Sequence, residues 1–197
     1  MTRRLFLYLH GHGSSPAEVD GVITVVDPER NYIAVTPEGP LAVSVTGRAW
    51  FDDGVRGTDA ASLERAVEWV SGVLVGTTTD LAVELSHVVL GGYSQGAATA
   101  LAVAASLSAP LGGLLLQSPF VPEGAGVELE LDKVPPMPVL VQHGTDDEVV
   151  PTFFAEHVSA GLAAAGCSVE LQPFAAGHDR TPEMLEAARV WLESRII

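Results

Sequence analysis

The sequence has a single cysteine, Cys167, and only ten lysine and arginine residues against 25 aspartates and glutamates. One cysteine cannot form an internal disulfide, and so low a cysteine content is typical of a reducing compartment. The net charge of −15 argues against nucleic acid and anionic membrane surfaces as partners, because phosphate groups are bound by clustered basic side chains. We interpret the acidity as that of a solvated surface; a preference for neutral or cationic substrates is the alternative.

Long apolar runs are scarce as well. The run at residues 5–9 is too short for the apolar core of a signal peptide. Residues 85–122 contain no Asp, Glu, Lys or Arg, but Ser94, Gln95 and Pro110 interrupt them, which favours a buried strand, helix and strand over a membrane helix. We therefore expect a cytoplasmic protein with no stable membrane association.

Strand-like and helix-like segments alternate along the 197 residues, of which 47% are hydrophobic. The alternation predicts one domain over residues 1–197 with an α/β fold: a mostly parallel sheet with helices on both faces and no large lid domain. Strands are expected at 5–9, 32–36, 87–92, 112–117, 138–144 and 168–174. Helices are expected at 59–75, 96–107, 151–165 and after Thr181–Pro182. The segment 16–27 fits either a short helix or a loop. Two further segments, 41–58 and 118–138, are expected to be mostly loop.

Functional side chains of such a sheet follow the carboxyl ends of its strands. At one of these ends, Gly92-Tyr93-Ser94-Gln95-Gly96 forms a G-x-S-x-G motif between a predicted strand and a predicted helix. This is the context of a nucleophile elbow, a strained turn that exposes the serine hydroxyl. Glycine is needed at both ends of the motif because strand and helix approach closely there. Ser94 is therefore the candidate nucleophile.

A serine nucleophile needs a histidine base and a carboxylate that orients the histidine, in the chain order Ser, acid, His. The segment after the fifth strand offers Asp146, Asp147 and Glu148 as the acid. His178 follows the sixth strand and is the predicted base, whereas His157 lies within a helical pattern and is expected on a helix surface.

The negatively charged oxygen of a tetrahedral intermediate needs two N–H donors. The backbone N–H of Gln95 is one candidate. The other is the backbone N–H of His12, in the glycine-containing segment HGHGSSP after the first strand. His10 and His12 form a His-x-His pair, but such a pair alone is weak evidence for a metal site, so neither a metal nor a cofactor is predicted.

Taken together, these residues resemble the phospholipase/carboxylesterase family of α/β-hydrolases, which includes the acyl-protein thioesterases. The resemblance covers nearly the whole chain, from about residue 7 to residue 191. It rests on the segments LHGHGSSP, RAWFDD, LGGYSQGAA, VLVQHGTDDEVVP and the Gly-His pair at 177–178. It implies a serine hydrolase in which Ser94, Asp147 and His178 form the triad.

The same resemblance implies His12 and Gln95 as oxyanion residues and Trp50 as a wall of the acyl pocket. We also expect Tyr93 and the loop at 118–138 at the substrate pocket. The sequence also departs from the family: it is shorter than typical members, its first strand is expected almost at residue 1, so that the hairpin often found before this strand is not expected, and Glu148 replaces a common proline. These departures concern substrate choice more than chemistry.

We therefore predict cleavage of small-molecule carboxylic esters, or thioesters, through an acyl-enzyme. The alternative is a non-catalytic protein that binds a ligand on the same fold. A dienelactone-type hydrolase would carry cysteine at the elbow, whereas Cys167 lies at a predicted helix-to-strand turn.

Overall fold

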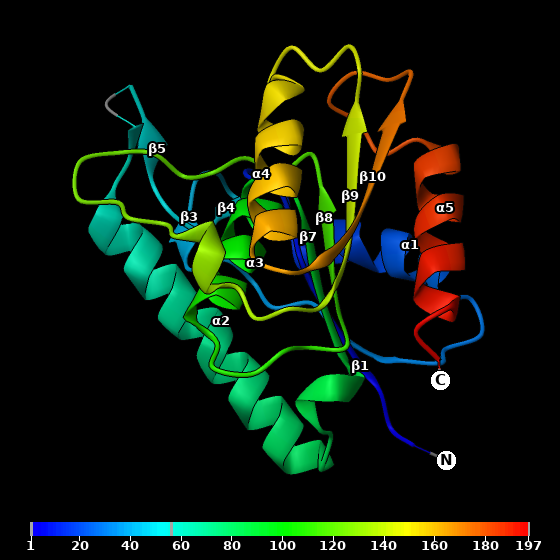
Figure 1. Ribbon diagram of the computed structural model, residues 1–197. Coiled ribbons are helices and arrows are strands. Elements are labelled where there is room, and N and C mark those ends of the chain that lie inside the picture. Colours follow the sequence, from blue (N-terminus) through cyan, green and yellow to red (C-terminus); the bar gives the residue numbers. More distant parts are fainter. Residues whose placement is uncertain (1, 56, 197) are drawn as a thin grey trace.

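The computed structural model describes residues 2–55 and 57–196, and a six-stranded sheet forms its centre (Figure 1). The strands follow the order β10-β9-β8-β7-β1-β2 across the sheet, and their pairings are parallel. The predicted α/β sheet is confirmed, and each predicted strand is present with its ends shifted by two residues at most. These strands are β1 (Leu5–Leu9), β2 (Ile33–Val35), β7 (Val88–Tyr93), β8 (Gly113–Gln117), β9 (Pro138–Gly144) and β10 (Ser168–Phe174).

Helices cover both faces of this sheet, as predicted (Figure 1). Two of them pack against each other on one face, α1 and α5, and the other three lie on the opposite face. The helices are α1 (Pro16–Val26), α2 (Ala60–Leu81), α3 (Gln95–Ser106), α4 (Phe153–Ala164) and α5 (Pro182–Glu193). Within the described residues, no helix is both long and apolar enough to cross a membrane. The uncharged segment 85–122 instead forms β7, α3 and β8.

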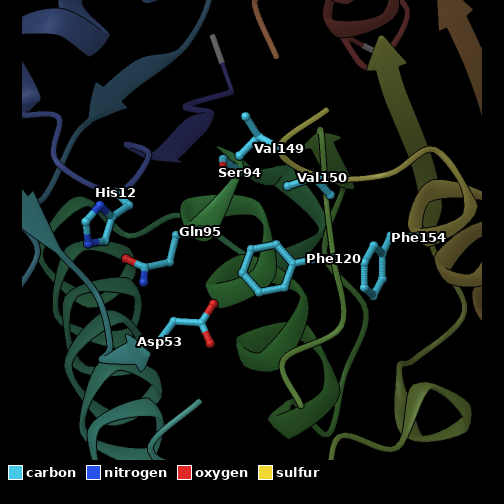
Figure 2. A pocket seen from close by; sticks show the side chains of 8 residues that line it. All are labelled: His12, Asp53, Ser94, Gln95, Phe120, Val149, Val150 and Phe154. Atoms are coloured by element: carbon cyan, nitrogen blue, oxygen red, sulfur yellow. The ribbon is translucent and has the colours of Figure 1, made fainter. Parts of the chain in front are cut away.

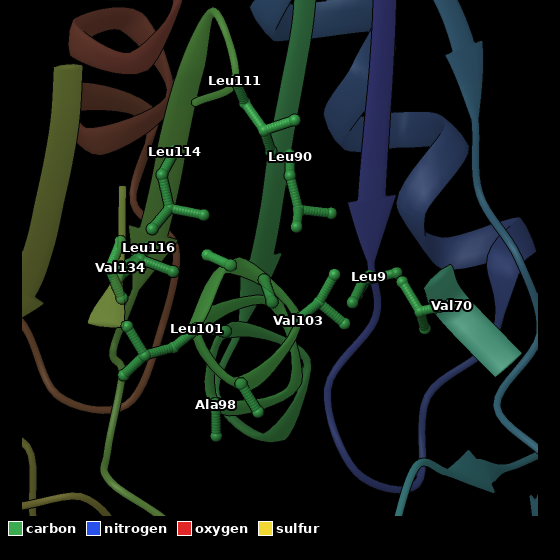
Figure 3. Close-up of a cluster of buried hydrophobic side chains, with 14 of the residues drawn as sticks. Leu9, Val70, Leu90, Ala98, Leu101, Val103, Leu111, Leu114, Leu116 and Val134 are labelled. Atoms are coloured by element: carbon green, nitrogen blue, oxygen red, sulfur yellow. The ribbon is translucent and has the colours of Figure 1, made fainter. Parts of the chain in front are cut away.

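Alternation along β1 divides the core into two parts. Leu5, Leu7 and Leu9 belong to the cluster beneath α2, α3 and α4, whereas Phe6 and Tyr8 belong to the cluster beneath α1 and α5. In the larger cluster, side chains of α3 lie against those of β1, β7 and β8 (Figure 3). Gln95–Ala104 of α3 are all buried, which explains the alanine-rich sequence: a helix enclosed on every side needs small side chains.

Helix α2 extends beyond its predicted end near Val75 and stops only at Leu81. The added turns contain three threonines at 77–79, a residue type with a low helix propensity. In the structure, the Thr78 hydroxyl donates to the carbonyl of Leu74 (2.8 Å) and the Thr79 hydroxyl to that of Val75 (2.7 Å). These bonds satisfy the hydroxyl groups inside the helix.

The two predicted loop regions contain short ordered pieces. Segment 41–58 holds two small antiparallel ribbons: β3 (Leu41–Ala42) pairs with β4 (Arg48–Ala49), and β5 (Asp53–Gly54) pairs with β6 (Gly57–Thr58). Segment 118–138 contains a 3-10 turn that packs against α4. The N–H of Thr58 donates to the carbonyl of Glu123 (2.8 Å), so the β5–β6 hairpin is attached to the second loop.

A row of buried polar side chains connects four strands of the sheet. The Tyr8 hydroxyl donates to the side-chain oxygen of Gln117. Gln117 Nε2 donates to Gln142 Oε1 (2.8 Å), and Gln142 Nε2 donates in turn to Gln172 Oε1 (2.9 Å) and to the Met184 carbonyl (3.0 Å). The row thus connects β1, β8, β9 and β10 and joins the sheet to α5, close to the carboxyl ends of the strands.

Because Gln142 is the centre of this row, Gln142→Leu should lower the free energy of unfolding by roughly 3 kcal/mol, since its neighbours lose their partners inside the protein. Gln172→Leu is the matched control: Gln172 is partly exposed, water can replace its partner, and a loss of about 1 kcal/mol is expected. Urea denaturation of both variants measures the difference, and equal losses would contradict a cooperative row.

Candidate active site

Ser94 lies on the turn between β7 and α3, where the sequence predicts a nucleophile elbow. Its backbone adopts φ 53° and ψ −118°, a strained conformation for a residue with a side chain. A Cβ atom at Gly92 would lie 2.4 Å from the carbonyl carbon of Gly96, and a Cβ atom at Gly96 would lie 2.3 Å from the Leu9 carbonyl oxygen. This close packing holds Ser94 at the N-terminus of α3, beside the positive end of the helix dipole.

His178 lies between Ser94 and Asp147 and contacts both. Its Nε2 is 3.0 Å from Ser94 Oγ, and its Nδ1 is 2.7 Å from Asp147 Oδ2. The three residues follow β7, β9 and β10, so the carboxyl ends of these strands bring them together. Of the three candidate acids, Asp147 is buried, whereas Asp146 and Glu148 are exposed.

The Asp147 carboxylate is surrounded by hydrogen-bond donors. Oδ1 accepts the backbone N–H groups of Val149 (2.9 Å) and Val150 (2.8 Å). Burial alone would raise the pKa of Asp147, but the hydrogen bonds from His178 and from these two N–H groups outweigh it and lower the pKa below its ordinary value. The buried His143 donates from Nε2 to the Val150 carbonyl (2.8 Å) and so fixes the turn. Asp147 therefore stays ionised and can hold the Nδ1–H of His178.

Tyr93 supports the loop that carries His178. Its hydroxyl donates to the His178 carbonyl (2.7 Å), and the two ring centroids are 5.0 Å apart. The guanidinium of Arg180 lies over the Tyr93 ring, 4.5 Å from its centroid. Burial raises the pKa of Tyr93, so its hydroxyl keeps the proton that it donates. Tyr93, expected at the substrate pocket, thus contacts the base loop.

The buried His10 holds the loop after β1 through two hydrogen bonds. Nε2 of this buried histidine accepts the N–H of Gly39 (3.0 Å), so Nδ1 carries the proton and donates to the Gly11 carbonyl (2.8 Å). Burial lowers the pKa of His10, which favours this neutral form. His12 is exposed and points into the cavity described below. Among the described residues, no group of three or more His, Cys, Asp or Glu side chains could hold a metal ion.

Gln95 connects the elbow with the segment around Trp50. As the first residue of α3, it has a backbone N–H without a partner inside the helix. Its side-chain Oε1 accepts the N–H of Trp50 (2.9 Å), and its Nε2 donates to the Phe51 carbonyl (2.8 Å). The Trp50 indole donates to the His10 carbonyl (2.7 Å) and is fully buried. Trp50, expected as a pocket wall, is therefore buried outside the cavity lining and supports the loop after β1.

A cavity of about 400 Å³ opens beside Ser94 (Figure 2). His12 and Gln95 line it together with Ser94, and the other lining residues are Asp53, Phe120, Val149, Val150 and Phe154. Phe120 lies in the 118–138 loop that we expected near the pocket. The remaining four were not predicted as pocket residues, although Asp53, Val149 and Val150 lie in segments that carry the family resemblance. The Asp-x-x-Val-Pro spacing at 147–151 was the available signal for Val150.

The sequence model of the phospholipase/carboxylesterase family matches residues 2–196. The chain belongs to this family. It is 27% identical over 186 residues to acyl-protein thioesterase 1 of Gibberella zeae, covering 87% of this chain and 79% of the relative. It is 25% identical over an aligned length of 213 to a probable carboxylesterase SOBER1-like of Arabidopsis thaliana, covering 100% and 80%.

Solved structures have the same fold. The crystal structure of Arabidopsis thaliana SOBER1 superposes with a TM-score of 0.84 at 25% identity, over the whole of both chains. The structure of esterase PE8 gives a TM-score of 0.85 at 24% identity, over 98% of this chain and 93% of the other. As a member of the phospholipase/carboxylesterase family, the protein has the α/β-hydrolase fold and is an ester hydrolase.

The packing at the elbow predicts that Gly96→Ala destabilises the hydrolase by roughly 3 kcal/mol, because the new methyl group overlaps the Leu9 carbonyl. Gly72→Ala is the control: in α2 a Cβ at Gly72 meets nothing within 4 Å, and alanine should stabilise the helix by about 1 kcal/mol. Chemical denaturation compares the two, and a Gly96→Ala protein as stable as wild type would refute the tight contact.

Proposed function

We propose that the chain acts as a single domain that hydrolyses carboxylic esters and thioesters through an acyl-enzyme formed on Ser94. The observation that carries the proposal is the hydrogen-bonded series from Asp147 through His178 to Ser94, with separations of 2.7 and 3.0 Å. A serine hydroxyl is a poor nucleophile by itself, and such a series supplies both its base and the group that orients the base.

In the first half of the reaction, Ser94 Oγ attacks the substrate carbonyl carbon while its proton moves to His178 Nε2. The ionised Asp147 holds Nδ1–H and stabilises the imidazolium that forms. The tetrahedral intermediate then collapses: the bond between the carbonyl carbon and the leaving oxygen or sulfur breaks, and His178 Nε2 passes its proton to the leaving group. The acyl group stays on Ser94.

In the second half, His178 takes a proton from water, which attacks the acyl carbon, and the proton then returns to Ser94 Oγ as the carboxylic acid leaves. In both halves the backbone N–H groups of His12 and Gln95 stabilise the negatively charged oxygen. Each donor of this kind lowers the activation barrier by about 3 kcal/mol. Since both donors are backbone groups, the side chain of His12 can be replaced without removing its donor.

Ser94→Ala should lower kcat for p-nitrophenyl acetate by about 10⁶ and abolish labelling by a fluorophosphonate probe, because the nucleophile is gone. Cys167→Ser is the control: Cys167 is buried between α4 and β10, away from the cavity, and the variant should keep wild-type turnover and labelling. A Ser94→Ala protein with the wild-type rate would refute the mechanism. A folded wild type that neither labels nor hydrolyses esters would support the ligand-binding alternative instead.

Asp147→Asn should reduce kcat by about 10⁴, because an amide cannot hold His178 in the required tautomer. Asp146→Asn removes the same charge from the neighbouring exposed position and should leave kcat within about twofold, as exposed charges interact weakly. Steady-state kinetics on one ester compares the pair. Equal effects of the two substitutions would contradict the assignment of Asp147 as the acid.

A further inference from the structure

The cavity beside Ser94 combines apolar side chains with a carboxylate. Phe120 and Phe154 make part of its wall aromatic, and Val149 and Val150 add aliphatic surface. Among the described residues that line it, Asp53 is the one carboxylate, and none is Lys or Arg. The charge of the whole chain, −15, has the same sign. A substrate group that enters this cavity therefore meets a negative potential.

The Asp53 carboxylate is held in place. Asp53 pairs with Thr58 in the β5–β6 hairpin, and the hydroxyl of the buried Thr58 donates to Asp53 Oδ1 (2.9 Å). Thr58 is fixed in turn through its N–H, which donates to the Glu123 carbonyl (2.8 Å). A carboxylate accepts about four hydrogen bonds, so Asp53 keeps capacity for a donor on a ligand. The group is thus positioned before any substrate binds.

Asp53 lies well apart from Ser94 in the cavity, and Phe120 projects into the space between them (Figure 2). The ring of Phe120 is oriented by edge contacts with Phe51 and Phe154, with centroids 6.3 and 6.4 Å away. An aromatic face followed by a carboxylate attracts a cation in two ways, through the ring quadrupole and through the full charge.

The position of His178 indicates which half of the substrate enters the cavity. His178 must protonate the leaving group, so the leaving group lies on the His178 side of Ser94. His178 is not among the residues that line the cavity, whereas both oxyanion residues are. The cavity therefore holds the acyl group, which runs from Ser94 past Phe120 towards Asp53.

We propose that the substrates of this site are esters or thioesters whose acyl group ends in a cation, an ammonium or quaternary ammonium group bound by Asp53 and Phe120. This rests on the proposed function of Ser94, because the acyl group is defined by its attack. An acyl group that ends in a carboxylate is disfavoured by the same contacts. The acidity of the chain, taken as that of a solvated surface, then also serves substrate selection.

The test compares two p-nitrophenyl esters of equal shape, one ending in a trimethylammonio group and the other in a tert-butyl group, at several chain lengths. Wild type should prefer the cation by about threefold to tenfold in kcat/KM at the best length, mainly through KM. The preference should shrink as salt is added, because ions screen the interaction. A ratio of one or below at every length would overturn the proposal.

Substitutions locate the source of the preference. Asp53→Asn should bring the ratio of the two esters close to one, and Phe120→Leu should reduce it in part. Asp52→Asn is the matched control: it removes the same charge one residue earlier, outside the cavity lining, and should retain the preference. Equal ratios in the Asp52→Asn and Asp53→Asn proteins would show a general surface effect and overturn the assignment.

Arg56 is the cation nearest to Asp53 in the sequence and lies outside the described residues. Arg56→Gln should retain the preference for the cationic ester, and its loss in this variant alone would overturn the role of Asp53. The neutral tert-butyl ester separates this inference from the proposed function. If its hydrolysis requires Ser94 while the charge ratio is one, only the cation site fails; if Ser94→Ala hydrolyses it at the wild-type rate, the proposed function fails.

Discussion

The close contact between the start of α3 and the end of β1 is the constraint on which the site depends. With only hydrogen on the Gly96 Cα, the helix can begin against the Leu9 carbonyl, and Ser94 is then left in a strained turn. A conformation of this kind costs about 1–3 kcal/mol. The burial of α3 between the sheet and its neighbours offsets that cost, because Gln95–Ala104 are all enclosed in the core. The elbow is therefore stabilised by the helix that follows it.

Because this contact fixes Ser94, it also determines which strands can bring Asp147 and His178 to it. Ser94 is fixed near the centre of the sheet, on β7, whereas Asp147 and His178 follow β9 and β10 at one side of it. The row of side chains through Gln117 and Gln142 crosses the intervening strands and limits their sliding. The proposed triad, spread over three loops, thus keeps its geometry because the strands beneath the loops are connected by polar side-chain hydrogen bonds as well as by the sheet.

The sequence predicts those parts of the site that depend on local patterns. The elbow, the strands and the position of His178 after β10 follow from glycine spacing, apolar runs and chain order. The cavity wall does not, because Asp53 and Phe120 come from segments far apart in the sequence, which are joined by contacts such as the Thr58 N–H with the Glu123 carbonyl and the ring of Phe51 with that of Phe120. Trp50 shows the opposite case: the family resemblance implies a place in the pocket wall, yet its indole donates to the His10 carbonyl and is buried.

Two aspartates near this site differ in what surrounds them, and the difference separates their roles. Asp147 is buried, and both of its oxygens are occupied by donors from Val149, Val150 and His178. Its charge is therefore compensated locally, and it interacts only weakly with a ligand. Asp53 is exposed and lines the cavity, and within residues 2–55 and 57–196 its carboxylate accepts one hydrogen bond, from the hydroxyl of Thr58. A carboxylate that is fixed but only partly satisfied acts on what enters the cavity, so in the proposed mechanism one fold uses aspartate both to orient the base and to select the acyl group.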